Sequence, residues 1–177
     1  MDVAVLESDA VDAASRVALC RLWDRAFGDR FDDDDIDHAF GGVHVLVWQG
    51  ADLIGHASAV PRMIRFGDQP WRTVGYVEGV ATDPEHQHQG VGTRVMTRLH
   101  DEIGTRWGVA LLSTGRATGF YELLGWRRWL GPSYTQTATG IVLDGEHGGL
   151  MVFSGDQRVV LDRTVAVTCQ DRPGDAW

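Results

Sequence analysis

The sequence predicts an α/β domain built on a mixed β-sheet. Strand-like and helix-like apolar patterns alternate along the chain, which is the pattern of an α/β class. A long strand-like run at 71–82 leads into the glycine-containing segment Gln87-His88-Gln89-Gly90-Val91-Gly92. That segment opens directly into an amphipathic helix, so a strand, a glycine turn and a helix follow one another.

The elements are expected in a fixed order: one strand, two helices, three antiparallel strands, a helix, a strand, a helix and several short strands. Pro61 marks a bend or a bulge at the end of the strand 53–60, and residues 63–66 continue that strand. Gly125 caps the last helix. The ranges are strands at 3–6, 43–48, 53–60 with 63–66, 71–82 and 109–112, and helices at 11–27, 32–37, from 91 onward and 115–124.

The composition limits the classes of protein and of partner. A chain of 177 residues with 44% hydrophobic content fits one globular domain over 1–177. The net charge of −9 argues against nucleic acid or an anionic membrane as the main partner and fits a cationic substrate. The alternative is that the acidity only keeps the protein soluble. All 16 basic residues are Arg, so a catalytic Lys or Schiff base is excluded.

The sequence predicts a cytoplasmic protein. Its N-terminus, Met1-Asp2-Val3-Ala4-Val5-Leu6-Glu7, is acidic and lacks the apolar core of a signal peptide. No apolar run approaches the ~20 residues of a membrane-spanning helix. Cys20 and Cys169 are expected to be reduced thiols.

The glycine segment predicts a phosphate site. At a helix N-terminus the first backbone N–H groups have no partner within the helix, and the positive end of the helix dipole lies behind them. Gly90 and Gly92 allow the backbone to come close to a ligand because they carry no Cβ. The alternative is a simple turn before a core helix whose apolar stripe is Val91, Val95, Met96, Leu99, Ile103 and Trp107.

The order of elements resembles the GNAT superfamily of acetyl-CoA-dependent N-acetyltransferases. The resemblance is carried by Gln87, Gly90 and Gly92 after the fourth strand and by Phe120-Tyr121-Glu122-Leu123-Leu124-Gly125-Trp126 after the fifth. It implies a GNAT-type mixed, mostly antiparallel central sheet flanked by helices, and acetyl-CoA as co-substrate. It also implies that the glycine loop holds the coenzyme A pyrophosphate and that the preceding strand holds the pantetheine arm. The residues expected to bind coenzyme are Val80, Ala81, Thr82, Gln87, His88, Gln89, Gly90, Val91, Gly92 and Thr93.

A narrower resemblance is to the aminoglycoside 2′-N-acetyltransferases. The matching segments are Phe40-Gly41-Gly42-Val43-His44, Gly75-Tyr76-Val77-Glu78-Gly79-Val80-Ala81 and Gly174-Asp175-Ala176-Trp177. It implies transfer of an acetyl group to the 2′-amino group of a small cationic aminoglycoside, and the GNAT resemblance implies a homodimer. Two positions depart from the family pattern: the coenzyme loop has no Arg, and Arg30 stands where an acidic residue is expected.

Three residues are expected to carry the chemistry. Glu78, a carboxylate in an apolar strand, is the candidate base that deprotonates the amine. The backbone N–H of Val80 is the candidate donor that polarises the thioester carbonyl. By resemblance, Tyr121 is the acid that protonates the leaving sulfur. The alternatives are a solvent-facing Glu78 and a Tyr121 that belongs to an aromatic core cluster. No residue has the pattern of a covalent nucleophile, which favours direct attack in a ternary complex.

Substrate binding is assigned mainly to acidic groups. The candidates are Asp35, Glu78, Gly79, Ser113, Glu146, Asp175 and Trp177. A terminal aromatic residue held by packing would fix its carboxylate as an acceptor for ammonium groups, whereas the alternative is a frayed end. His86 and His88 with Glu85 have no further ligand pair nearby, so no metal site is expected.

Two other functions compete with aminoglycoside acetylation. One is a GNAT acetyltransferase for another small amine, such as a polyamine or an amino sugar. The other is a non-catalytic module that binds acetyl-CoA or aminoglycoside, against which an intact Glu78 and Tyr121 argue. Turnover against aminoglycosides with and without a free 2′-amine discriminates between them.

Overall fold

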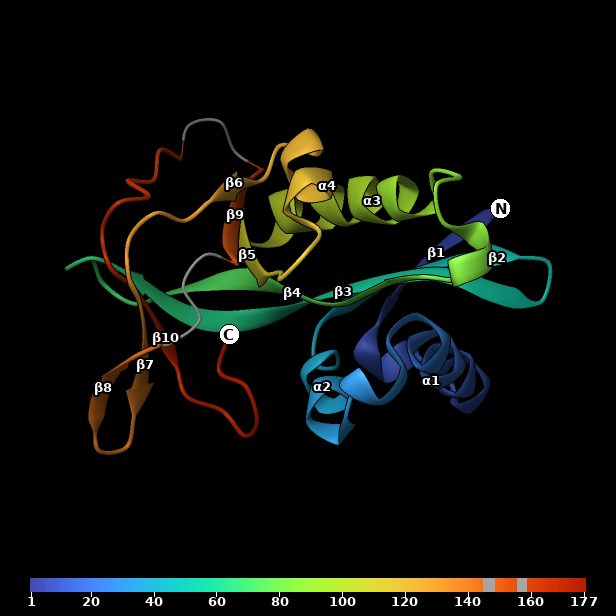
Figure 1. Cartoon of the computed structure of the whole chain (residues 1–177), viewed down its shortest axis with the longest axis horizontal. Helices are drawn as coiled ribbons and strands as arrows, with labels where there is room; N and C mark the ends of the chain where they lie inside the picture. The colour runs from blue at the N-terminus through green and yellow to red at the C-terminus, as the bar shows by residue number, and fades with distance from the viewer. Residues whose placement is uncertain (145–148, 156–158) are drawn as a thin grey trace. The chain divides into compact units, whose positions relative to one another are not determined.

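The computed structural model, which describes residues 1–144, 149–155 and 159–177, contains both helices and strands (Figure 1). The chain divides into a first unit, Met1–Val60 with Val77–Glu102, and a second unit, Pro61–Tyr76 with Ile103–Trp177. Three elements belong partly to each unit: β3 (Asp52–Phe66), β4 (Arg72–Thr82) and α3 (Val91–Arg106). The expectation of one domain over 1–177 stays a prediction.

The first unit contains an antiparallel sheet of β1 (Asp2–Glu7), β2 (Val43–Gln49) and the first part of β3. His44 is paired with Ser58, and Leu46 with His56. Because side chains alternate along a strand, these four residues share one face of the sheet. The register shifts at Val47 and Trp48, where a β-bulge interrupts the pairing.

Helices cover both faces of this sheet. α1 (Ala13–Phe27) and α2 (Asp33–His38) lie on one side, and α3 lies on the other (Figure 1). Trp23 of α1 packs in a buried cluster with Leu46. On the opposite face, a Cβ added to Gly55 would come within 2.5 Å of Val91 and 3.0 Å of Val95, so α3 packs directly on the backbone of β3.

Local sequence explains where these helices begin. Asp12 caps α1 by accepting a hydrogen bond from the Ser15 N–H at 2.8 Å. Asp32 and Asp35 form a reciprocal capping box at the start of α2. Short 3₁₀ turns lie at Ser8–Ala10, Gly28–Arg30 and Pro84–His86.

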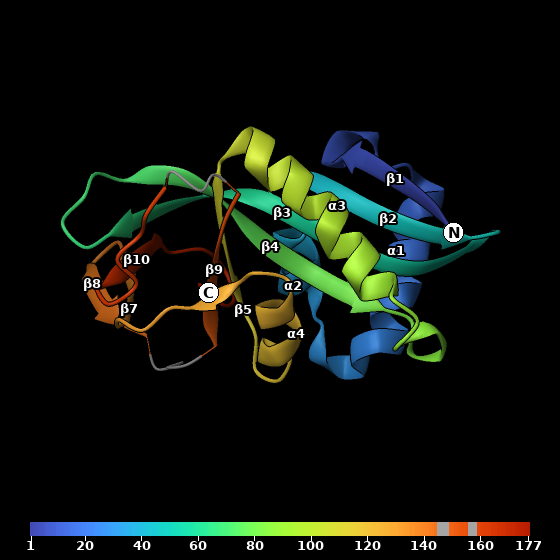
Figure 2. The ribbon, with the colours of Figure 1, turned by 90° about the horizontal axis from the view of Figure 1, so that it is seen from above.

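The second unit contains the remaining strands (Figure 2). β5 (Val109–Ser113) runs parallel to β4 at Gly75 and Tyr76, and β9 (Leu150–Ser154) is antiparallel to β5. β6 (Arg127–Arg128) pairs with β9. β10 (Val167–Gln170) lies between β3 and β7 (Ser133–Thr137), antiparallel to the former and parallel to the latter, and β8 (Gly140–Leu143) pairs with β7.

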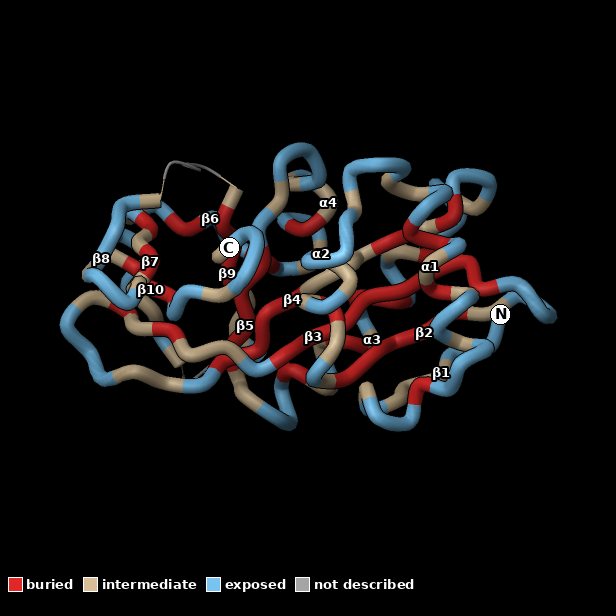
Figure 3. Tube along the Cα trace, turned by 90° about the horizontal axis from the view of Figure 1, so that it is seen from below, coloured by how far each residue is buried: buried red, intermediate tan, exposed pale blue. Residues whose placement is uncertain are grey.

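The expected α/β class and the mixed, mostly antiparallel sheet are confirmed. Among the described residues, the longest buried runs are 53–60 in β3 and 43–47 in β2 (Figure 3). As expected, β3 continues past Pro61 to Phe66, and the exposed Pro61 lies within this one strand. One expectation about elements was wrong. α4 spans Thr118–Leu123 and does not begin at Gly115, because residues 114–117 form a bend in which the Thr114 Oγ1 accepts the Ala117 N–H at 3.2 Å.

The burial of α3 follows the predicted stripe. Its apolar side chains Val91, Val95, Met96, Leu99 and Ile103 are all buried. Within residues 1–144, 149–155 and 159–177, none of the helices combines the length and the apolar character of a membrane span.

Candidate active site

The backbone of β4 departs from regular strand geometry at Gly79. Its φ is +57°, in the left-handed region that favours glycine. A Cβ there would lie 3.1 Å from the indole nitrogen of Trp23. Glu78, Gly79 and Val80 are half-buried, whereas Val77 and Ala81 on either side are buried. The segment predicted to carry the chemistry is therefore the kinked part of β4.

Side chains hold two successive carbonyls at this kink. The Gly79 oxygen accepts the indole N–H of Trp23 at 3.1 Å and lies 2.8 Å from Nδ1 of His56. The Glu78 oxygen accepts the hydroxyl of the fully buried Ser58 at 3.3 Å. These contacts fix the peptide units on both sides of Gly79.

A pair of buried histidines leads away from the kink. His56 Nε2 lies 3.0 Å from Nδ1 of His44, whose Nε2 lies 2.9 Å from the Ser8 hydroxyl. Burial lowers the pKa of His56 to about 3, with a contribution from His44. Burial, with help from Arg16, lowers the pKa of His44 to about 4. Both imidazoles are therefore neutral at neutral pH.

These histidines were not among the predicted site residues, although the sequence carries a signal for them. The predicted hairpin at 43–60 places His44, His56 and Ser58 on one face once its register is known. Three polar residues on an otherwise apolar face call for hydrogen-bond partners. The partner carbonyl at Gly79 could not be found from local sequence, because it lies on another strand.

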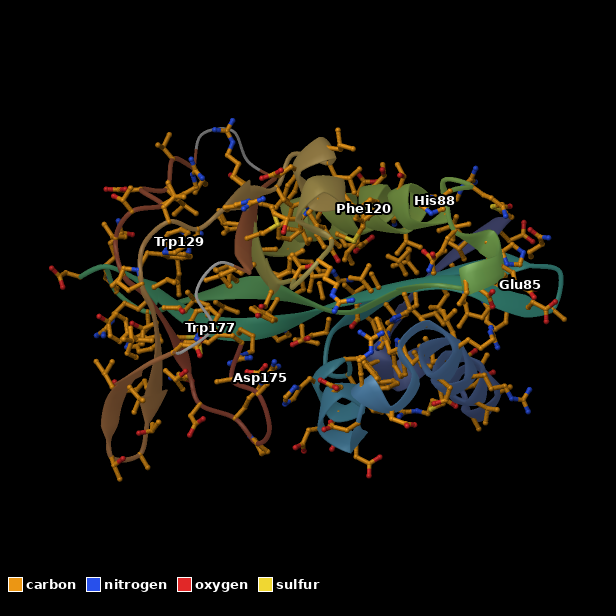
Figure 4. The ribbon with its side chains drawn as sticks, in the orientation of Figure 1. Glu85, His88, Phe120, Trp129, Asp175 and Trp177 are labelled. Carbon is orange, nitrogen blue, oxygen red and sulfur yellow. The ribbon has the colours of Figure 1, made fainter. Side chains whose placement is uncertain are left out.

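The loop between β4 and α3 begins with a buried carboxylate. Asp83 accepts the Glu85 N–H at 2.9 Å and contacts the Arg25 guanidinium at 2.6 Å. Burial alone would raise the pKa of Asp83, but the hydrogen bonds from Glu85 and Arg25 outweigh it and lower the pKa. Glu85 and His88 lie on this loop ahead of α3 (Figure 4).

The predicted coenzyme loop is open to solvent. Gln87, His88, Gln89 and Gly90 are exposed, and no atom lies within 4 Å of a Cβ built on Gly90. Positive φ values of +59° at His88 and +80° at Gly90 turn the chain into α3. The Arg94 N–H closes the first helical turn on Gly90 O at 3.0 Å.

The start of α3 fits a phosphate group. The amides of Val91, Gly92 and Thr93 precede the first helical hydrogen bond and have no acceptor within the helix. A surface cleft of about 480 Å³ adjoins them. Its lining includes Gly90, Thr93, Arg94, Arg98 and Asp101, and Arg98 is paired with Asp101 at 3.6 Å and with Glu102 at 2.6 Å. The backbone donors at this helix N-terminus suit an anion, and Arg94 adds a positive charge beside them.

In the second unit, Tyr121 is the predicted acid. It is buried in α4, where its ring centroid lies 5.1 Å from that of Phe120 and 6.1 Å from that of Trp126. Burial raises the pKa of the Tyr121 phenol, which keeps it protonated. The aromatic cluster is present, and the catalytic role of Tyr121 stays a prediction.

The segment after β10 is held by side chains of its own unit. Arg62 Nη2 donates to Gln170 O at 2.8 Å and to Ala176 O at 3.0 Å. The Trp177 N–H donates to the Asp175 carboxylate at 3.1 Å. Trp177 is buried, and its ring centroid lies 6.4 Å from that of Tyr76. The residue is anchored by packing, which argues against a frayed end.

The other predicted substrate contacts are distributed over both units. Asp35, in the first unit, caps α2 through its bond to the Asp32 N–H at 3.0 Å. Ser113, in the second unit, is exposed at the end of β5, and Asp175 is also exposed (Figure 4). Glu146 lies outside the described residues.

Titratable and thiol side chains elsewhere form no metal centre in the part of the chain that the structure describes. His86 Nδ1 lies 3.6 Å from the Asp83 carboxylate, and His88 is exposed. Cys20 and Cys169 are free cysteines, one in each unit.

Comparison with known proteins gives the family. Residues 10–129 match the acetyltransferase (GNAT) domain family. The chain is 32% identical over 177 residues to the aminoglycoside 2′-N-acetyltransferase of Mycolicibacterium fortuitum, covering 98% of this chain and 90% of that protein.

Solved structures share the fold at low sequence identity. The GNAT family N-acetyltransferase YhbS from Escherichia coli, in complex with coenzyme A, aligns with a TM-score of 0.68 and 12% identity over 95% of this chain and 88% of that chain. An aminoglycoside 6′-N-acetyltransferase complexed with coenzyme A aligns with a TM-score of 0.63 and 15% identity over 90% and 100%. The chain therefore belongs to the GNAT acetyltransferase family, and it is an N-acetyltransferase that uses acetyl-CoA.

Proposed function

We propose that this protein transfers the acetyl group of acetyl-CoA to the 2′-amino group of aminoglycosides. The observation that carries the choice of substrate is the near full-length relationship to an aminoglycoside 2′-N-acetyltransferase at 32% identity. The net charge of −9 agrees with a cationic substrate. The amine attacks directly in a ternary complex of enzyme, coenzyme and aminoglycoside, and two copies of the chain form the proposed assembly.

Glu78 is the proposed base. Its place at the kink of β4 leaves the residue half-buried. It removes a proton from the substrate ammonium, either directly or through water, so that the nitrogen lone pair is available for attack. Glu78 and the neighbouring Gly79 backbone also belong to the proposed aminoglycoside contacts.

The Val80 amide and Tyr121 serve the two ends of the thioester. The Val80 N–H is the proposed donor to the carbonyl oxygen, on which negative charge develops as the amine attacks. Tyr121 is the proposed donor of the proton to the departing sulfur, and its raised pKa keeps that proton in place beforehand.

The coenzyme supplies an activated acetyl thioester. We assign its pyrophosphate to the backbone of Gln87 to Thr93 and its pantetheine arm to Val80, Ala81 and Thr82. The support is the exposed loop, the open space beside Gly90 and the position of Arg94 in the adjoining cleft. With no arginine in the loop itself, backbone N–H groups would make most of the phosphate contacts.

The remaining aminoglycoside contacts are assigned to acidic and aromatic side chains. Asp175 lies next to the buried anchor Trp177, which limits the conformations of the segment that carries it. A carboxylate held in this way offers charge-assisted hydrogen bonds to ammonium groups. Asp35, Ser113 and Glu146 complete the proposed set.

The decisive experiment is acetyl-CoA turnover against a panel of aminoglycosides. Gentamicin-type substrates, which carry a 2′-amine, should be acetylated, and kanamycin A, which carries a 2′-hydroxyl, should not be. Mass spectrometry and NMR of the product should place one acetyl group on the 2′-nitrogen. Equal turnover of both substrates would refute the proposed regiochemistry, and turnover of polyamines alone would refute the substrate class.

A further inference from the structure

A continuous row of hydrogen-bonding groups crosses the first unit from Ser8 to the kink of β4. Successive distances are 2.9 Å from Ser8 Oγ to His44 Nε2, 3.0 Å from His44 Nδ1 to His56 Nε2, and 2.8 Å from His56 Nδ1 to Gly79 O. His44 and His56 are fully buried. Buried polar groups of this kind need every hydrogen bond made, and the row supplies a partner for each ring nitrogen.

The Gly79 end fixes the direction of this row. A carbonyl oxygen only accepts, so Nδ1 of His56 carries the proton. A neutral imidazole carries one N–H, which leaves His56 Nε2 as an acceptor. His44 therefore donates to it through Nδ1 and keeps its own Nε2 as an acceptor.

The Ser8 end independently requires the same direction. The Gly41 and Gly42 N–H groups donate to Ser8 Oγ at 2.8 and 3.0 Å and occupy both of its lone pairs. Only the hydroxyl proton remains, and it points at His44 Nε2 at 2.9 Å or at Gly42 O at 3.0 Å. In either case His44 Nε2 cannot donate to Ser8. The contacts at Ser8 and at Gly79 therefore both indicate that each histidine carries its proton on Nδ1.

The row ends on the peptide unit that contains the Val80 N–H. In a trans peptide the C=O and the N–H point in opposite directions, so holding the Gly79 oxygen also aims the Val80 hydrogen. A second donor, the Trp23 indole at 3.1 Å, holds the same oxygen. Hydrogen bonds accepted by a carbonyl polarise the amide and make its N–H a stronger donor, by about 10–30% per bond.

We infer that His56, backed by His44 and Ser8, and Trp23 are positioning residues that aim the Val80 amide and strengthen it as a donor to the thioester carbonyl. This inference rests on the proposed role of Val80. None of the four residues needs to touch the substrate. They act through one peptide unit, whose orientation Gly79 makes possible by its φ of +57°.

A proton relay is a poorer account of the same row. A relay needs a group at its end that can take up or release a proton, and the row ends at a peptide carbonyl. Two separate N–H donors converge on that oxygen, which suits orientation and polarisation. Proton transfer along the row would also reverse a tautomer pattern that both ends fix.

The first test is Trp23→Phe, which removes one N–H from Gly79 O and retains an aromatic ring in the core. Trp129→Phe is a matched control, because the buried Trp129 also donates its indole N–H to a backbone carbonyl, that of Val165 at 3.0 Å. In protein labelled with ¹⁵N-valine, Trp23→Phe should shift the Val80 amide resonance, and Trp129→Phe should leave it unchanged.

The second test compares two replacements of His56. Asn places an N–H close to the position of the imidazole Nδ1–H and can still donate to Gly79 O, whereas Leu cannot. His56→Leu should shift the Val80 resonance and lower kcat at least tenfold, part of the about 10²–10³ that loss of an oxyanion donor costs. KM for acetyl-CoA should change less than twofold, and His56→Asn should restore kcat to within threefold of the parent. If His56→Leu does not fold, Trp23→Phe decides the question.

A Val80 resonance that does not move in folded Trp23→Phe would overturn the inference. A shifted Val80 resonance with an unchanged kcat would also overturn the inference, because the orientation of the Val80 N–H would then not affect the reaction. The resonance is measured in the coenzyme-free protein, so it does not depend on substrate identity. Failure of the proposed function would instead appear in the parent protein, as absence of 2′-acetylation, and kcat would then be compared with whichever amine the parent accepts.

Discussion

Side chains that donate to backbone carbonyls hold two regions of the molecule: the kink at Gly79 in the first unit and the segment 170–177 in the second unit. The donors differ in charge and in burial. At Gly79 the donors are the neutral, buried rings of Trp23 and His56. In the segment 170–177 they are the half-buried guanidinium groups of Arg62 and Arg172, which reach Gln170, Ala176 and Asp175.

This difference predicts how each region responds to its surroundings. A buried neutral imidazole is insensitive to salt but loses its arrangement when it is protonated. A guanidinium keeps its charge at every accessible pH, and its contacts near the surface weaken as salt is added. Acid should therefore act first on the kink of β4, and ionic strength should act first on the segment 170–177.

The largest effect is expected for Glu78→Gln, which tests whether the kink of β4 carries the catalytic base. Glu78→Gln preserves the shape of the side chain and removes the base, so kcat/KM at neutral pH should fall about 10²-fold. The dissociation constant of acetyl-CoA, measured by calorimetry, should stay nearly constant. A loss smaller than about threefold would remove Glu78 from the role of base.

Acidification is the next largest effect. The pKa values of His44 and His56, about 4 and about 3, lie below the ~6.5 of an unfolded histidine. The unfolded chain therefore binds more protons, and stability present above pH ~6.5 is lost as the pH falls toward those values. By pH 5 each histidine should reduce the free energy of unfolding by about 2 kcal/mol. Urea titrations followed by circular dichroism at pH 7 and pH 5 measure the loss.

Two other groups need to be separated from this pH effect. His100 has a pKa lowered to about 4 by burial and contributes in the same window. Asp83, with a pKa lowered below 3.8, contributes only at more acidic pH. Replacing both His44 and His56 should remove most of the loss between pH 7 and pH 5 and leave the share of His100. An unchanged loss in that double variant would contradict the assignment.

The segment 170–177 should govern affinity for the amine. Deleting Asp175–Trp177 should raise the KM for an aminoglycoside at least tenfold, about 1.4 kcal/mol, and leave the KM for acetyl-CoA nearly unchanged. The effect should shrink at high salt, because the lost contacts are charge-assisted. Steady-state kinetics at low and high salt provide the measurement, and an unaltered aminoglycoside KM would make the segment purely structural.

The smallest effect concerns the guanidinium that holds this segment. Arg62→Lys keeps the charge but places its nitrogen one bond short of Nη2, the single guanidinium nitrogen that donates to both Gln170 O and Ala176 O. It should cost about 1 kcal/mol of unfolding free energy. It should raise the aminoglycoside KM less than the deletion does and leave kcat unchanged. A fall in kcat larger than the rise in KM would break the proposed separation between the two regions.

Sequence patterns predicted the parts of the fold that depend on local periodicity. The buried stripe of α3 was predictable because the spacing of its apolar side chains follows the period of a helix. The start of α4 was predicted wrongly. The bend before α4 depends on a hydrogen bond of the Thr114 side chain, which apolar periodicity does not report.

Sequence patterns predicted the candidate site only where resemblance or local chemistry marked it. The glycine loop and Glu78 stand out in a single segment. The residues that hold the kink do not stand out in one segment. Ser8, Trp23, His44 and His56 form their hydrogen-bonded row to Gly79 only in the folded protein. Such a network depends on tertiary hydrogen bonds, which periodicity and composition do not report.

The register of β2 on β3 also limits how this gene can change in length. His44 and His56 face α1, while Gly55, one residue away, must fit beneath Val91 and Val95 of α3. Inserting or deleting one codon within either strand would exchange these faces and place a side chain where only hydrogen fits. Viable length variants should therefore cluster in the turn around Gly50 and be absent from the two strands. Deep insertion and deletion scanning should find few tolerated length changes within β2 and β3 and more of them in the turn between these strands.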